Sequence, residues 1–169
     1  MRLIKIPFTI FIILMCFSCS IKYSFTGASI STETKSFQVN YFQNNSTLIE
    51  PGIDRDFTNK LIDLLINQTN LELVKSKGDL IFEGEIVEYR ISPTTATANN
   101  TAAQNRLTIG INVRFFDKND SESDFEKRFS FYYDFPANNQ LIGSQKETAV
   151  DEIFERITQD IFNEALAKW

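Results

Sequence analysis

Three consecutive segments of this chain, 79–91, 106–116 and 125–134, alternate between apolar and polar residues, and few folds accommodate that pattern. A period of two is typical of a strand that turns one side to the core and the other to water or a partner. The apolar positions of one parity are Leu80, Phe82, Ile86, Leu107, Ile109, Ile111, Val113, Phe115, Phe125, Phe129, Phe131 and Tyr133. Lys127 interrupts this series, and Gly84 within it indicates a bulge or a close approach of two backbones. The segments predict a meander whose apolar face needs a cover.

Two helical patterns flank the meander and can supply that cover. The first follows Pro51 and Gly52, and its apolar stripe at helical spacing consists of Phe57, Leu61, Leu64 and Leu65. The second opens with Ser144 and Glu147, the spacing of a capping box. Its apolar face, closed by Trp169, consists of Val150, Ile153, Phe154, Ile157, Ile161, Phe162, Ala165 and Leu166. A strand over 36–42, with Phe37, Val39 and Tyr41 on one face, precedes the first helix. We therefore predict one α+β domain of order β-α-β-β-β-α.

The two connections within the meander differ in character. Segment 92–103 is rich in Thr, Ala and Asn and contains no large apolar residue. It is long for a hairpin connection, which indicates a mobile loop, a functional loop, or both. Segment 117–124 is a shorter acidic turn. We expect 92–103 to form a tip that reaches toward a partner.

The amino terminus has the features of an export signal. Arg2 and Lys5 precede a short apolar run, and a small residue, Ser18, lies directly before Cys19. This arrangement resembles a bacterial lipoprotein signal, in which Cys19 becomes the acylated first residue. Cys16 is a competing acylation site, and a plain secretory signal is the alternative. We predict a signal peptide over 1–18, an acylated terminus and tether over 19–35, and a single domain over 36–169.

Composition excludes several classes of chemistry. The chain of 169 residues contains no histidine, which removes the commonest general base and the usual zinc ligands. Its two cysteines both lie in or beside the leader, so no disulfide is expected in the domain. Loss of Arg2 and Lys5 with the leader takes the formal net charge from −5 to −7. That balance argues against nucleic acid and against non-specific adhesion to anionic lipid.

Two groups of carboxylates could in principle act as an acid–base pair or bind calcium. They are Glu83, Glu85 and Glu88 on one strand and Asp117, Asp120, Glu122 and Asp124 in the turn. The turn lacks the glycine and the spacing of an EF-hand loop. Solvated surface is the favoured interpretation of both groups. We accordingly predict that the protein is not an enzyme and has no metal or cofactor.

Four arginines are the candidate contacts for a lipid or protein partner: Arg90, Arg106, Arg114 and Arg128. Most share the outward parity of the strands, so neighbouring strands could gather them on one face and present them to phosphates. Scattered surface charge is the alternative, because Glu83, Glu85 and Glu126 share that face. Tyr89, Phe116 and Tyr132 also have outward parity, which hints at a protein partner.

The ordered sequence resembles the LptE lipoproteins, in a diverged branch of that family. The resemblance rests on Cys19, on 23–27 (YSFTG), on 78–86 (GDLIFEGEI), on 105–109 (NRLTI) and on the final AKW. It implies a two-layer sandwich with two helices on one face of an about four-stranded, mostly antiparallel sheet. It also implies an outer-membrane lipoprotein that plugs an LptD-type β-barrel and helps it assemble. Members of the family assist insertion of lipopolysaccharide into the outer leaflet, but none of their binding residues can be transferred to this chain.

Three functional hypotheses follow. The first is a non-enzymatic subunit of the lipopolysaccharide translocon, anchored to the outer membrane and facing the periplasm or the barrel lumen. The second is a lipoprotein adaptor of the same build for a cell-wall enzyme or a secretion pore, since fold does not determine function. A hydrolase that uses two carboxylates is disfavoured, because no acidic pair stands out.

Overall fold

The computed structural model describes residues 30–48, 50–96 and 102–167. The predicted signal peptide, most of the tether and Trp169 lie outside this range. In chain order the elements are β1 (Ser36–Val39), β2 (Gln43–Asn44), α2 (Ile53–Gln68), β3 (Glu72–Leu73), β4 (Leu80–Ala96), β5 (Ala102–Asp117), a short 3-10 turn η1 (Ser121–Ser123), β6 (Phe125–Pro136) and α3 (Gly143–Leu166).

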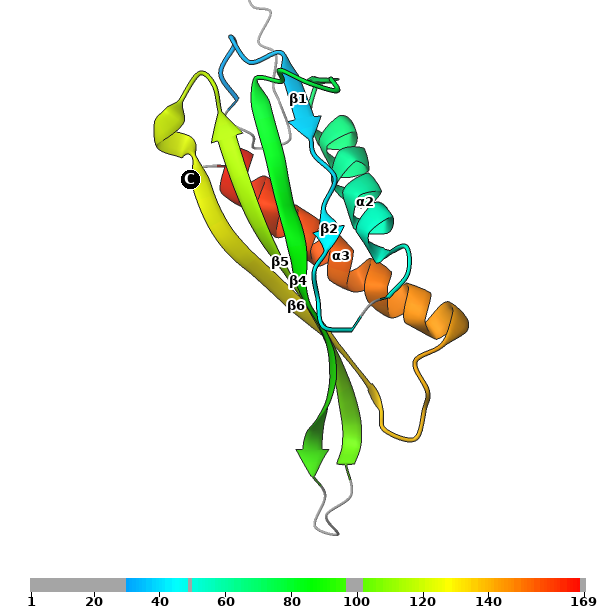
Figure 1. The fold of residues 1–169 in the computed structure, drawn as a ribbon. Helices are drawn as coiled ribbons and strands as arrows, with labels where there is room; N and C mark the ends of the chain where they lie inside the picture. The colour runs from blue at the N-terminus through cyan, green and yellow to red at the C-terminus, as the bar shows by residue number, and fades with distance from the viewer. Residues whose placement is uncertain (1–29, 49, 97–101, 168–169) are drawn as a thin grey trace, which may run out of the picture.

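The strands form one mixed sheet of six strands in the order β3-β1-β4-β5-β6, with β2 also paired to β4. The predicted meander is present, since β4, β5 and β6 pair antiparallel in sequence. The amino-terminal strands are different, because β1 runs parallel to both β3 and β4, and β2 parallel to β4. Both helices pack on one side of the sheet, with α3 crossing behind the meander in Figure 1. The predicted α+β fold with helices on one face is confirmed.

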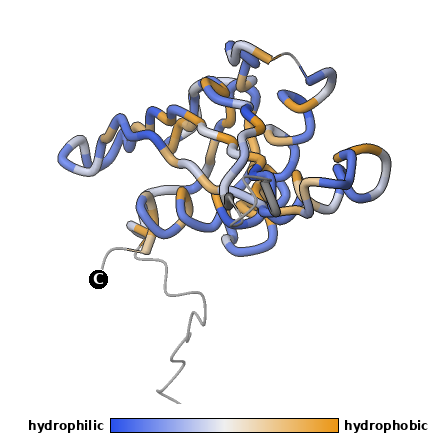
Figure 2. The backbone as a smooth tube through the Cα atoms, turned by 90° about the horizontal axis from the view of Figure 1, so that it is seen from below, coloured by the Kyte–Doolittle hydropathy of each residue, from blue (hydrophilic) through white to orange (hydrophobic). Residues whose placement is uncertain are grey.

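The core lies between the helices and the sheet. The apolar series predicted along β5 is fully buried, and Phe37, Phe57, Leu61 and Leu65 are buried against it. A run of edge-on ring contacts joins β2's neighbour Phe42 to Phe57 of α2 and Phe154 of α3, with centroids 5.1 Å apart at each step. Figure 2 shows the alternation of hydrophobic and hydrophilic residues along the chain that produces this core.

Gly84 is a point of close approach, as predicted. A Cβ at this position would lie 2.0 Å from the carbonyl oxygen of Asn112 and 2.7 Å from the ring of Phe42. Only a residue without a side chain fits between the neighbouring backbone and the buried ring.

Two breaks in strand regularity overturn predictions of side-chain direction. After β1 the backbone shifts so that Phe42 is fully buried and Tyr41 is 53% exposed, the reverse of the prediction for Tyr41. In β4 the register with β5 shifts at Val87, between Ile86 and Glu88. This bulge turns Tyr89 inward, where it is buried, and burial raises the pKa of its hydroxyl to about 12. The prediction of an outward Tyr89 was therefore wrong.

Two further predictions need correction. The segment 92–103 is mostly strand rather than loop, because β4 continues to Ala96 and β5 begins at Ala102, and the hairpin extends past the body of the sheet (Figure 1). The capping box of α3 does not form. The helix begins at Gly143, its cap position is Ile142, and no side chain bonds the first-turn amides. Thr148 instead donates its hydroxyl to the carbonyl of Ser144.

Candidate functional site: the open face of the sheet

We call the side of the meander that points away from the helices the open face. Cross-strand register places its residues in rows that run across β4, β5 and β6. Its charged and aromatic residues are Glu83, Glu85, Glu88, Arg90, Arg106, Arg114, Phe116, Glu126, Arg128, Tyr132 and Asp134. All four arginines predicted as candidate contacts lie here. Outward parity predicted this for Arg106, Arg114 and Arg128, whereas Arg90 faces outward only because of the bulge at Val87.

Arg114 on β5 lies between carboxylates of the neighbouring strand. Its Nε donates to Glu83 at 3.0 Å, and its Nη1 donates to Glu85 at 3.5 Å. These hydrogen bonds, with Glu83 as the main cause, raise the pKa of the guanidinium above its usual value. Arg114 is about one-third exposed, so water still reaches one side of the group.

Arg128 and Arg90 share one carboxylate. Glu88 accepts from Nε of Arg90 at 2.9 Å and from Nη2 of Arg128. Arg128 reaches Glu88 from β6 by lying over Gly110 of β5, where an added Cβ would meet its Nη2 at 2.9 Å. Both arginines are more than half exposed. Glu88 can take this position only because the bulge at Val87 turns it outward.

Arg106 of β5 pairs with Asp134 of β6 on the open face. It donates from Nε and Nη2 to the two oxygens of Asp134, at 2.7 and 2.8 Å, in the bidentate geometry that suits a guanidinium. Its carbon Cζ lies 3.5 Å from the ring centroid of Tyr132. The bonds from Arg106 hold the pKa of the Asp134 carboxyl below its usual value and raise the pKa of Arg106.

The open face is thus an ion-paired surface rather than a bare basic patch. Each of its four arginines is already paired with a carboxylate, which lies on the same strand for Arg90 and on another strand for the other three. A phosphate that binds here must compete with these carboxylates. Phe116 and Tyr132 are exposed on the same face, as predicted. Whether any of these residues contacts a lipid or a partner stays a prediction.

The carboxylates predicted as surface behave mainly as partners of these arginines and of the backbone. In the acidic turn, Asp124 accepts from the amide of Asp117 at 2.8 Å, and Asp117 accepts from the amide of Asn119 at 2.9 Å. Among the described residues no three His, Cys, Asp or Glu side chains lie close enough together to hold a metal ion. Neither described helix is long and apolar enough to cross a membrane.

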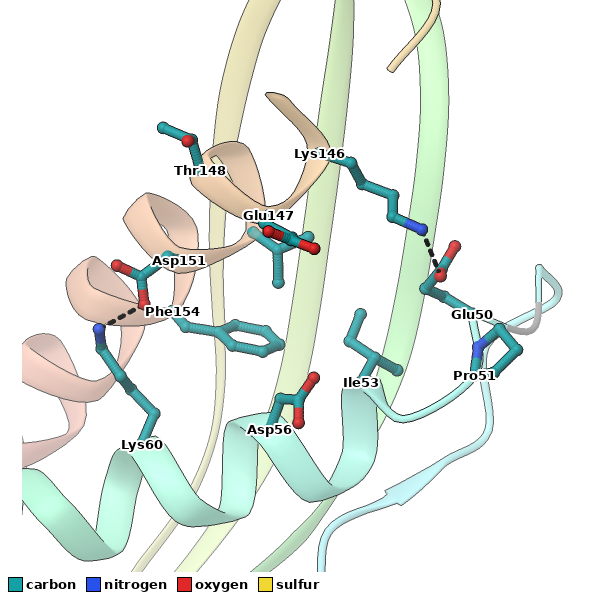
Figure 3. Close-up of a pocket in the computed structure, with 11 residues that line it drawn as sticks. Glu50, Pro51, Ile53, Asp56, Lys60, Lys146, Glu147, Thr148, Asp151 and Phe154 are labelled. Carbon is teal, nitrogen blue, oxygen red and sulfur yellow. Dashed lines mark hydrogen bonds and ion pairs between the residues drawn. The ribbon is translucent and has the colours of Figure 1, made fainter. Parts of the chain in front are cut away.

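A groove between the amino-terminal turns of α2 and α3 was not foreseen from the sequence. Its volume is about 600 Å³, and Ile53 and Phe154 form part of its wall (Figure 3). Lys146 donates to Glu50 at 2.8 Å at one end, and Lys60 donates to Asp151 at 2.5 Å at the other. These pairs join segments more than ninety residues apart, so no local pattern could have found them. The described residues that line the groove form no nucleophile–base arrangement. The pair Lys60–Asp151 joins the two helices, and the pair Lys146–Glu50 joins α3 to the segment before α2.

The fold is a small α+β sandwich whose open face carries a set of ion-paired arginines. The chain belongs to the LptE lipopolysaccharide-assembly family, since the model of that family matches residues 34–165. This confirms the resemblance drawn from the sequence. No curated protein sequence matches the chain significantly.

Two solved structures from other proteins have the same fold. The hypothetical protein CT253 from Chlamydia trachomatis is 10% identical, with a TM-score of 0.55 over 80% of this chain and 99% of that one. The uncharacterized lipoprotein B from Nitrosomonas europaea is 11% identical, with a TM-score of 0.54 over 86% of this chain and 88% of that one. At such identities the likeness shows the fold alone.

Proposed function

We propose that this protein is a non-enzymatic lipoprotein subunit of the lipopolysaccharide translocon, which plugs an LptD-type β-barrel and helps it assemble. The family match over 34–165 is the observation that carries the proposal. In this role the protein assists insertion of lipopolysaccharide into the outer leaflet by shape and contact, without a chemical step. The lack of histidine in the chain is consistent with that role.

The anchor in this proposal is Cys19, acylated after removal of 1–18. The small residue before it and the apolar run upstream support the assignment. One acyl-bearing residue followed by a tether to residue 35 would hold the sandwich at the outer membrane, facing the periplasm or the barrel lumen. Replacement of Cys19 by Ser should release the protein from membranes, whereas replacement of Cys16 by Ser should not. The reverse result would assign the anchor to Cys16.

The open face suits the interior of a barrel on physical grounds. The lumen of an outer-membrane barrel is polar, so a plug needs a surface that exchanges hydrogen bonds rather than one that buries apolar area. Arg90, Arg106, Arg114 and Arg128 can each exchange a carboxylate partner for a phosphate or for a carboxylate of the barrel wall. The same four residues are the proposed contacts for lipopolysaccharide.

Purification of the tagged protein from detergent-solubilised membranes of its native bacterium tests the proposal. We expect an outer-membrane β-barrel at near-equal stoichiometry. Recovery of a cell-wall enzyme or a secretion pore without a barrel would favour the adaptor hypothesis and contradict the translocon role.

Direct binding of lipopolysaccharide is tested separately. A variant with Arg106 and Arg128 replaced by Gln should bind purified lipopolysaccharide more weakly than wild type. A variant with Lys60 and Lys146 replaced by Gln is the matched control, because it loses two cations from the helical side. Equal loss in both variants would contradict a specific role for the open face.

A further inference from the structure

Strand β6 forms an open edge of the sheet. Its 12 residues, Phe125–Pro136, pair with β5 on one side. Within the described residues no strand pairs with its other side. Half of its backbone amides and carbonyls therefore point outward, and such a row is a template for pairing with another strand.

A groove beside this edge provides room for an added strand. It has a volume of about 470 Å³ and lies between Lys127–Ser130 of β6 and the last turns of α3. Its other wall consists of Asp160, Asn163 and Glu164 of α3 and of Ala167, which directly follows the helix. A strand placed against β6 would rest its inward side chains on this wall.

We propose that the β6 edge pairs with β6 of a second copy of this chain, antiparallel and with Phe131 opposite Phe131. This arrangement has a two-fold axis perpendicular to the sheet and continues the sheet with all helices on the same side. It places Arg128 of each copy opposite Asp134 of the other copy, so that two such pairs form, one on each side of the axis. On the core side it places Phe129 opposite Tyr133, an aromatic cross-strand pair.

The charge pattern of β6 selects this register. A shift that places Ser130 opposite itself brings Glu126 against Asp134, which is repulsive. A shift that places Tyr132 opposite itself leaves Arg128 against Pro136 and Asp134 against Ser130, with no ion pair. Of these three registers, only the one with Phe131 opposite itself continues the alternation of positive and negative side chains across the sheet. Within one copy, Arg128 already pairs with Glu88, and Arg106 already pairs with Asp134.

Lys127 restricts which strand can pair here. It is the charged residue on the core side of the edge, a position that discourages indiscriminate pairing. Its Nζ is held by Glu164 of α3 at 2.6 Å. In the proposed register Lys127 faces Phe135 of the second copy, whose ring is buried in its own core, and the ammonium of Lys127 keeps its own partner, Glu164.

A pair of charge reversals tests the proposal. Arg128 and Arg90 both pair with Glu88 and are similarly exposed, but only Arg128 lies at the β6 edge. Sedimentation velocity of the full-length protein in detergent, over a range of concentrations, should show a reversible dimer. Arg128→Glu should raise the dimer dissociation constant about tenfold, since two attractive cross-strand pairs become repulsive. Arg90→Glu should leave it unchanged. A wild-type monomer at every concentration, or equal effects of the two variants, would overturn the proposal.

A disulfide trap tests the register. Position 130 faces position 132 of the second copy, so the double variant S130C and Y132C should form a covalent dimer on mild oxidation. The single variant S130C should form no more covalent dimer than the unsubstituted protein does, because the residue opposite position 130 is then still Tyr132. Equal cross-linking by the single variant, or none by the double variant, would overturn the register. The readout is self-association, so it does not depend on the translocon role.

Discussion

The two faces of the meander are built from the same strands but are held in different ways. Along β5 every second residue from Leu107 to Phe115 is fully buried under the helices. The residues between them include Arg106 and Arg114, which water reaches and which are held by specific carboxylates on neighbouring strands. Burial stabilises the first face roughly in proportion to area and without regard to direction. The stabilisation of the second face by its ion pairs depends on the geometry of each pair and on solvent screening.

This contrast assigns different roles to the two faces. Apolar contact area on the helix side should dominate the free energy of unfolding. Ion pairs on the open face contribute little to stability, but they keep a charged surface in one conformation and leave it available for exchange with a partner. Substitutions on neighbouring residues of one strand can test this division directly.

The largest effect is expected at Phe82, whose ring is fully buried and lies 4.9 Å from that of Phe115. Phe82→Ala should lower the free energy of unfolding by about 3–5 kcal/mol, because it removes apolar area and leaves a cavity. The adjacent Glu83→Ala, on the open face, is the control and should cost far less. Chemical denaturation measures both. Similar losses at the two positions would contradict the division between the faces.

The next effect is expected at Gly84. Gly84→Ala places a methyl group against the carbonyl of Asn112 and the ring of Phe42, neither of which can move freely. We expect a loss of roughly 3 kcal/mol, the upper end of ordinary overpacking. Gly143→Ala is not a suitable control, because Gly143 has a φ of +55°. Ser130→Ala on the exposed side of β6 is the control, and it removes only the hydrogen bond from the Ser130 hydroxyl to the carbonyl of Ile109. Wild-type stability of Gly84→Ala would show that the strands can separate at this point.

Asp79 should show a smaller effect that depends on pH. Its Oδ2 accepts from the amides of Lys35 and Ser36, at 3.0 and 3.1 Å, and these bonds hold its pKa below the ordinary value of 3.8. The stabilisation is therefore complete above the ordinary pKa and is lost as pH falls through the lower folded-state value. Asp79→Asn should lower Tm by roughly 5 °C at pH 7.

The pH series provides the check on Asp79. The difference in Tm between wild type and Asp79→Asn should shrink as the pH falls below about 4, because the wild-type carboxyl then becomes neutral as well. Differential scanning fluorimetry at several pH values measures this. A difference that stays constant into strong acid would show that the carboxylate charge is unimportant.

The smallest effect is expected on the open face. Arg106→Gln removes the pair with Asp134 at a site that water reaches, and should change Tm by no more than about 2 °C at low salt. The difference should nearly vanish in 1 M salt, where the Debye length is about 3 Å. A loss as large as that of Phe82→Ala would mean that the open face supports the fold.

The sequence predicted the core face well but failed where the strands are irregular. Tyr41 and Tyr89 were placed on the wrong faces because strict alternation was assumed across the end of β1 and across Val87. Long-range contacts cause both irregularities. Phe42 is drawn inward with its amide bonded to the hydroxyl of Thr58, at 3.2 Å. The bulge at Val87 lies where β4 loses its pairing with β2 and keeps only β5.

The long hairpin shows a second limit. Segment 92–103 looked like a loop because it lacks large apolar residues. Its backbone still pairs at Ser92 with Arg106 and at Ala96 with Ala102. Ladder hydrogen bonds do not require apolar side chains, so polarity alone did not mark the end of the strands.

Residue pattern alone determined which sides of the strands and helices are apolar, and hence that two helices cover one face of a sheet. It did so because periodicity follows from local backbone geometry, which is the same wherever the segment lies. It also placed Arg106, Arg114 and Arg128 on the open face, whereas Arg90 reaches that face through the bulge at Val87. Only the tertiary structure decided their partners, such as Glu88 for Arg128, because a partner is set by register between strands that are distant in sequence. A one-residue bulge changes that register and leaves almost no trace in the local pattern.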